Sequence, residues 1–164
     1  MVNRLSHACL LLVCVSLGLL GAGSKAQAQG SIDFAERFEG GAPAGKQCSV
    51  SLPEKYSITQ RLDDVGCHIN SQYFKFNNVE SGAVLELWDH RTCGVLRMGP
   101  RSSDWVFILR TIKQPTTTRW MAVADIQTAD PMNNPIVAAG VQMLFKRVVN
   151  REWDQLSCIR VMRP

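Results

Sequence analysis

The stretch "EWDQLSCIRV" (residues 152–161) lies near the end of the chain and alternates polar and apolar side chains. Cys158 and Arg160 alternate with Ile159 and Val161, and this period of two residues predicts a half-buried β-strand. A cysteine inside such a strand raises the question of which other cysteine it meets.

The preceding sequence is built from segments of the same kind. Short alternating or apolar runs begin at Ile32 and are separated by clusters of Gly, Pro, Asn and Asp; they include "SIDFAERF", "QCSVSL", "QYFKF", "AVLELW", "WVFILRTI" and "RWMAVADI". Such spacing is typical of a β-sandwich or β-barrel. The sequence therefore predicts one mostly β domain over residues 29–164.

One segment fits a helix and a strand equally well. Asn134 is a suitable N-cap, Pro135 is suited to a first helical position, and Lys146 and Arg147 would lie near the helix C-terminus. The valines of the segment favour a strand instead, because β-branched side chains are restricted in helices. We therefore expect at most one helix, over about residues 135–150, and leave the strand as its alternative.

Residues 1–28 have the layout of a secretory signal peptide. A short polar start precedes the apolar run 8–23, and Ala26 and Ala28 provide the small residues of a cleavage site. The run is too short to span a bilayer, and no later stretch is long and apolar enough to do so. We expect a protein exported to the periplasm or secreted.

Cleavage of this leader would leave four cysteines: Cys48, Cys67, Cys93 and Cys158. An even number in an exported chain predicts two disulfides, for which three pairings exist.

The charge of the chain excludes one class of partner. Removing Arg4 and Lys25 with the leader takes two of 18 basic residues and leaves a small excess over 14 acidic ones. No run of basic residues is present, so we expect no nucleic-acid partner.

Two parts of the chain look like one motif written twice. One copy joins "SGAVLELWDHRTCG" (81–94) to "WDQLSCIRV" (153–161), and the other joins "IDFAERFEGG" (32–41) to "CHINSQYFKF" (67–76). The pattern resembles the βγ-crystallin motif, in which a strand with an aromatic and an acid leads into a hairpin closing on Gly. The resemblance implies a crystallin-like Greek-key β-sandwich with an insertion at about residues 105–151.

The resemblance also implies a cysteine pairing. In the family, a serine of the late strand packs under the folded hairpin of its own motif. Here Cys158 occupies that serine position and Cys93 lies in the hairpin just before Gly94. The resemblance therefore implies a Cys93–Cys158 disulfide, which leaves Cys48 and Cys67 for the first motif.

Calcium is the ligand best known in this family, and the residues at its binding boxes are poor in oxygen ligands. The second box keeps Asp154 and Ser157, and the equivalent first stretch keeps only Asn70 and Ser71, out of register. Because calcium takes six to eight oxygen ligands, we expect no calcium site.

Two sequence pairs, Cys67-His68 and His90-x-x-Cys93, could together supply four nitrogen and sulfur ligands to a zinc ion. Adjacent strand residues point to opposite faces, and export favours disulfides over thiolate ligands. We expect neither a metal nor another cofactor.

A catalytic interpretation has few residues to draw on, because only His68 and His90 remain after cleavage of the leader. Ser102 or Ser103 could join His90 and Asp104, but no nucleophile elbow marks them. Four carboxylates could supply a glycosidase pair but are more typical of exposed turns: Glu36, Glu39, Asp63 and Asp64. We therefore assign no catalytic residue.

The predicted insertion carries the candidate partner-binding residues. Trp and Arg are the residues that most often anchor protein interfaces, and the candidates are Trp105, Arg110, Arg119 and Trp120. Burial of the tryptophans in strands is the alternative. Trp88 occupies a core position of the resembled motif and is expected to pack there.

Bacterial members of the resembled family include exported proteins, metalloprotease inhibitors and killer-toxin-like proteins, many of them non-enzymatic. The resemblance implies a non-catalytic binding protein, an inhibitor or immunity-type protein acting on a secreted or periplasmic enzyme or toxin. A toxin-like effector acting on other cells and a small secreted hydrolase that uses His90 are the alternatives.

Overall fold

The protein is mostly β in a computed structural model, which describes residues 30–53, 57–67, 70–93, 105–149 and 156–163. A four-stranded sheet has the order β2-β1-β4-β7 and a six-stranded sheet has the order β3-β10-β5-β6-β9-β8. The smaller sheet consists of β1 (Ser31–Glu39), β2 (Ala42–Ser51), β4 (Tyr73–Asn77) and β7 (Met121–Ala122). The larger sheet consists of β3 (Ile58–Arg61), β5 (Val84–Trp88), β6 (Trp105–Thr111), β8 (Ile136–Ala138), β9 (Val141–Val148) and β10 (Cys158–Met162).

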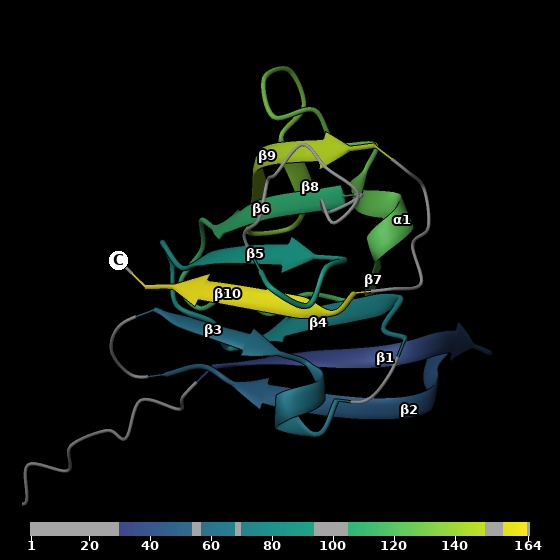
Figure 1. The fold of residues 1–164 in the computed structure, drawn as a ribbon. Helices are drawn as coiled ribbons and strands as arrows, with labels where there is room; N and C mark the ends of the chain where they lie inside the picture. The colour runs from purple at the N-terminus through teal and green to yellow at the C-terminus, as the bar shows by residue number, and fades with distance from the viewer. Residues whose placement is uncertain (1–29, 54–56, 68–69, 94–104, 150–155, 164) are drawn as a thin grey trace, which may run out of the picture.

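The two sheets exchange strands (Figure 1). In the first half of the chain β4 returns beside β1, while β3 crosses to the larger sheet and pairs with β10. In the second half β10 returns beside β5, while β7 crosses to the smaller sheet and pairs with β4. Every strand pair is antiparallel, and each half follows a Greek-key path whose third strand lies in the opposite sheet. The predicted mostly β fold is confirmed.

The core lies between the sheets and follows from the alternation of the sequence. Alternate residues of four strands are apolar and buried between the sheets: Ile32 and Phe34 in β1, Phe74 and Phe76 in β4, Leu85 and Leu87 in β5, and Trp105, Phe107 and Leu109 in β6. Among the largest fully buried side chains are Phe34, Phe74, Phe76, Leu87, Trp105, Phe107 and Leu109. Burying a side chain of this size stabilises the fold by about 1.5–3 kcal/mol, so this layer holds the sheets together.

The helix expected over about residues 135–150 is not formed, and its strand alternative is correct. The segment folds into β8 and β9, which pair with each other, and β9 continues the sheet beside β6. Gly140 makes the turn between them with φ of +82°, a conformation that interrupts a right-handed helix. Short helices occur elsewhere in the described residues, at Val123–Ile126 (α1) and Asp63–Val65 (η1).

The two disulfides join the cysteines that the sequence analysis paired. Cys48 of β2 is bonded to Cys67, which lies between η1 and β4, with 5.5 Å between their Cα atoms. Cys158 of β10 is bonded to Cys93 after β5, with a Cα separation of 5.4 Å. The closing strand therefore carries a cysteine because β10 lies under the turn that follows its neighbour β5.

The stretch predicted as an insertion belongs in part to the sandwich. Strand β6 lies between β5 and β9, and β7 forms one edge of the smaller sheet. What extends beyond the two Greek keys is the connection through α1, β8 and β9, which adds two strands to the larger sheet.

The predicted signal peptide, residues 1–28, lies outside the described residues. Within the described part of the chain, no helix has the length and apolar character needed to cross a bilayer.

Candidate functional site

An open pocket of about 630 Å³ lies where α1, β7, β8 and the tip of the β1–β2 hairpin come together. We call it the end pocket. Its lining combines aromatic, aliphatic and charged side chains, a composition common in ligand and partner sites. Its main side chains are Phe38, Tyr73, Arg119, Trp120, Asp125 and Ile136.

Strand geometry places the aromatic residues in the end pocket. Met121 of β7 is opposite Phe74 of β4 and points into the core, so the alternation turns its neighbour Trp120 outward. Tyr73 begins β4, and its ring lies 5.8 Å from the ring of Phe38. These three side chains come from distant parts of the sequence and share one lining.

Two opposite charges line the same pocket. Arg119 is exposed just before β7, and Asp125 is exposed on α1. Within the part of the chain that the structure describes, neither side chain has an ion-pair partner. Both therefore remain available to a ligand, and each offers charge-assisted hydrogen bonds.

Lys146 holds the segment that follows α1, whose Ala129 lines the end pocket. The Nζ atom of Lys146, on β9, donates hydrogen bonds to the carbonyl oxygens of Gln127 at 3.0 Å and Ala129 at 2.6 Å. Those carbonyls follow the short helix α1, so the ammonium ties the end of that helix to the larger sheet.

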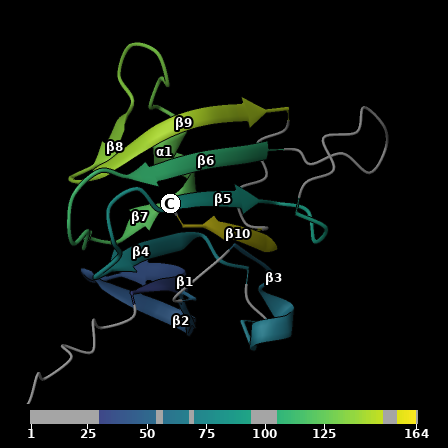
Figure 2. The same cartoon turned by 90° about the vertical axis from the view of Figure 1, so that its left-hand side faces the viewer.

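A braced loop borders the pocket. Asp130 and Asn134 exchange backbone hydrogen bonds of 2.9 and 3.0 Å. The Asp130 carboxylate accepts hydrogen bonds from the Met132 N–H at 2.9 Å and from the Asn133 amide at 2.7 Å. These donors lower the pKa of Asp130. Met132 is 90 % exposed on this loop, which joins α1 to β8 and projects from the top of the molecule (Figure 2).

The predicted partner-binding residues lie in three different environments. Arg119 and Trp120 come together in the end pocket. Trp105 is completely buried and packs 5.3 Å from the ring of Phe107, so for this residue the alternative of burial in a strand holds. Arg110 is exposed on β6, opposite Val84 of β5, and does not line the pocket.

The sequence analysis missed Phe38, Tyr73 and Ile136 as pocket residues. Phe38 and Ile136 are apolar yet 37 % and 50 % exposed. The fold brings the tip of the β1–β2 hairpin and the start of β8 to the same pocket, and no local sequence pattern predicts that they share it.

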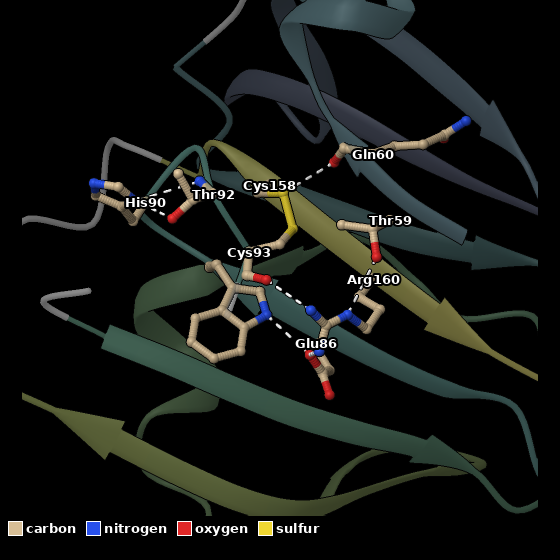
Figure 3. Close-up of a disulfide and its surroundings, with 9 residues drawn as sticks. Thr59, Gln60, Glu86, His90, Thr92, Cys93, Cys158 and Arg160 are labelled. Atoms are coloured by element: carbon tan, nitrogen blue, oxygen red, sulfur yellow. Dashed lines mark hydrogen bonds and ion pairs between the residues drawn. A yellow bond between two sulfur atoms is a disulfide. The ribbon is translucent and has the colours of Figure 1, made fainter. Parts of the chain in front are cut away.

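A second polar cluster lies beside the Cys93–Cys158 disulfide (Figure 3). The Arg160 guanidinium donates to Glu86 Oε2 at 3.1 Å and to the Cys93 carbonyl at 2.7 Å. Trp88 Nε1 donates to the same Glu86 oxygen at 3.1 Å. Trp88 is buried as expected, in a small apolar cluster with Cys93, Val106 and Cys158. All polar groups named here have partners, so the cluster is structural.

The residues of the hydrolase hypothesis are only partly described. His90 Nδ1 lies 2.8 Å from Thr92 Oγ1 and accepts the Thr92 N–H at 3.3 Å, which holds the ring within its own turn. Ser102, Ser103 and Asp104 lie outside the described residues. Of the carboxylates weighed as a glycosidase pair, Glu39 forms an ion pair with Arg37 and Asp63 forms one with Arg91. Glu36 accepts a hydrogen bond from the backbone N–H of Lys46.

The proposed metal ligands can be placed only in part. Cys67 and Cys93 are disulfide-bonded and are not thiolates. His68 and Asp154 lie outside the described residues. Among the residues that the structure describes, no three His, Cys, Asp or Glu side chains are grouped to hold a metal ion.

Fold and site together define a disulfide-bonded antiparallel β-sandwich with an open aromatic pocket at one end. Comparison with protein-family models, curated proteins and solved structures finds no match.

Proposed function

We propose that this is an exported, crystallin-like binding protein that acts on a protein partner, as an inhibitor or immunity-type protein against a secreted or periplasmic enzyme or toxin. Two Greek keys with the same connectivity, one in each half of the chain, support a motif that occurs twice. Two disulfides support an oxidising compartment.

The end pocket is the observation that carries this proposal. It places Trp120 and Arg119, residue types that dominate interface energetics, beside Phe38, Tyr73 and Asp125. A partner side chain that enters the pocket would stack on aromatic rings and meet both charges. The braced loop next to the pocket is held by the backbone hydrogen bonds of Asp130 and Asn134 and by the Asp130 carboxylate, so little backbone flexibility would be lost on binding.

The test compares capture by two variants. Three oxidised proteins are immobilised and exposed to periplasmic extract and culture medium. They are the wild type, the double variant Arg119→Glu/Ile136→Asp (the pocket variant) and the control Arg110→Glu, whose substitution lies away from the pocket. We expect wild type and control to retain the same protein, and the pocket variant to lose it.

The captured protein is then purified and assayed for its own activity with each variant added. Wild type should lower that activity in a dose-dependent manner, whereas the pocket variant should not. Equal capture by all three proteins, or no effect on the partner's activity, would contradict the proposal.

A further inference from the structure

The outward face of the four-stranded sheet carries one transverse row of polar and aromatic side chains. Asp33 of β1 is paired with Ser49 of β2 on one side and with Lys75 of β4 on the other. The β4–β7 register continues the row to Trp120, whose ring centroid lies 5.2 Å from Lys75 Nζ. We call Ser49, Asp33, Lys75 and Trp120 the polar row.

Contacts within the polar row fix its side chains. Ser49 Oγ donates to Asp33 Oδ1 at 2.7 Å, and Lys75 Nζ lies 3.3 Å from Asp33 Oδ2. Burial alone would raise the pKa of Asp33, but hydrogen bonds from Ser49, Asn77 and Lys75 outweigh it and lower the pKa. The carboxylate is therefore held ionised and its charge is balanced by Lys75.

A hollow of about 300 Å³ lies along the row and reaches the indole of Trp120. Asp33, Ser49 and Gln47 line it beside the ring. Short hydrogen-bonding residues flank it, including Ser31, which accepts a hydrogen bond from Asn77 Nδ2 at 3.4 Å. The face thus offers one flat aromatic surface amid hydroxyl, amide, carboxylate and ammonium groups.

We propose that the polar row binds an uncharged oligosaccharide, with one pyranose ring stacked on the face of the Trp120 indole opposite Lys75 and its hydroxyls bonded to Asp33 and Ser49. A pyranose has an apolar C–H face and a hydroxyl edge, which match an aromatic face bordered by fixed donors and acceptors. The ligand is uncharged because the carboxylate and the ammonium of the row neutralise each other. This function is distinct from the proposed binding of a protein partner, although Trp120 lines both the hollow and the end pocket.

The experiment is isothermal titration calorimetry of the oxidised protein with cellohexaose, chitohexaose and maltohexaose, and with an acidic galacturonate hexamer. We expect saturable binding of at least one neutral sugar and weaker binding of the acidic one. Trp120→Ala and Asp33→Ala should each weaken that affinity at least tenfold, because one loses the stacking surface and the other the central acceptor.

Two further variants separate this site from the end pocket and from misfolding. Ser49→Ala removes one hydroxyl at the surface and should weaken sugar binding, while the protein still unfolds in one cooperative thermal transition. Arg119→Ala, which lines only the end pocket, should leave sugar affinity unchanged even if it abolishes capture of a protein partner. Absence of binding to all three neutral sugars overturns the inference. So does preference for the acidic hexamer, or binding that Trp120→Ala and Ser49→Ala leave intact.

Discussion

Arg160 and Glu86 lie directly opposite each other on the paired strands β10 and β5, and their side chains form an ion pair of 3.1 Å. The Glu86 side chain is 9 % exposed, and it also accepts the indole N–H of Trp88. A carboxylate buried to this degree needs its cation.

Replacing Arg160 with Leu should therefore destabilise the protein. We expect a loss of about 2 kcal/mol in the free energy of unfolding, less than for a fully buried pair because Arg160 remains one third exposed. Urea denaturation measures the change. The matched control is Arg37→Leu, whose ion pair with Glu39 is more than half exposed and should contribute about 0.5 kcal/mol or less. Equal effects of the two substitutions would contradict the structural role of Arg160.

The two disulfides should differ in their contribution to stability. Cys93–Cys158 closes a separation of 65 residues and Cys48–Cys67 one of 19. Restriction of the unfolded chain then predicts losses of about 4 and about 3 kcal/mol for the respective double Cys→Ser variants. Chemical denaturation of both variants tests the order, and non-reducing peptide mapping verifies the remaining bond. A larger loss from removing Cys48–Cys67 would contradict this expectation.

The hydrogen bonds around Asp33 predict a dependence of stability on acid. The folded pKa of Asp33 is lowered, so the contribution of this carboxylate is present above its unfolded pKa, about 3.9. It is lost as the pH falls through the folded pKa. We expect Asp33→Asn to lose less stability than wild type between pH 6 and pH 3, measured by thermal unfolding. A steeper loss in the variant would show that the sign is wrong.

The role of the Asp130 carboxylate in holding the braced loop can be tested without a binding partner. Because the Asp130 carboxylate accepts the Met132 N–H at 2.9 Å, that amide should exchange with deuterium slowly for a residue so exposed. We expect Asp130→Ala to speed exchange at Met132 while amides in β6 remain protected. NMR-detected exchange resolves both positions. Unchanged exchange at Met132 would mean that the carboxylate does not brace the loop.

The sequence alone predicts the strands because alternation depends on near neighbours. It leaves three cysteine pairings open, and the observed one is implied only by the resemblance to the βγ-crystallin motif. Alternation at Phe34 and Phe74 identifies the inward face directly. The end pocket is different, since Phe38 and Tyr73 belong to one sheet and Ile136 to the other. The sequence does not show which of Trp105 and Trp120 is buried. The strand register does, because it places Trp105 on the inward face.

Gly140 tests the one segment for which the sequence favoured neither helix nor strand. In the β8–β9 turn its φ is +82°, and an added Cβ would lie 3.0 Å from Lys113 Cβ. Gly140→Ala should therefore cost about 1–2 kcal/mol, whereas in a helix the same change would stabilise by about 1 kcal/mol. Gly66→Ala is the control, because its φ is +77° but no atom lies within 4 Å. Denaturation midpoints should fall for both variants, and further for Gly140→Ala, whose side chain is also crowded. A higher midpoint for Gly140→Ala would instead support a helix in this segment.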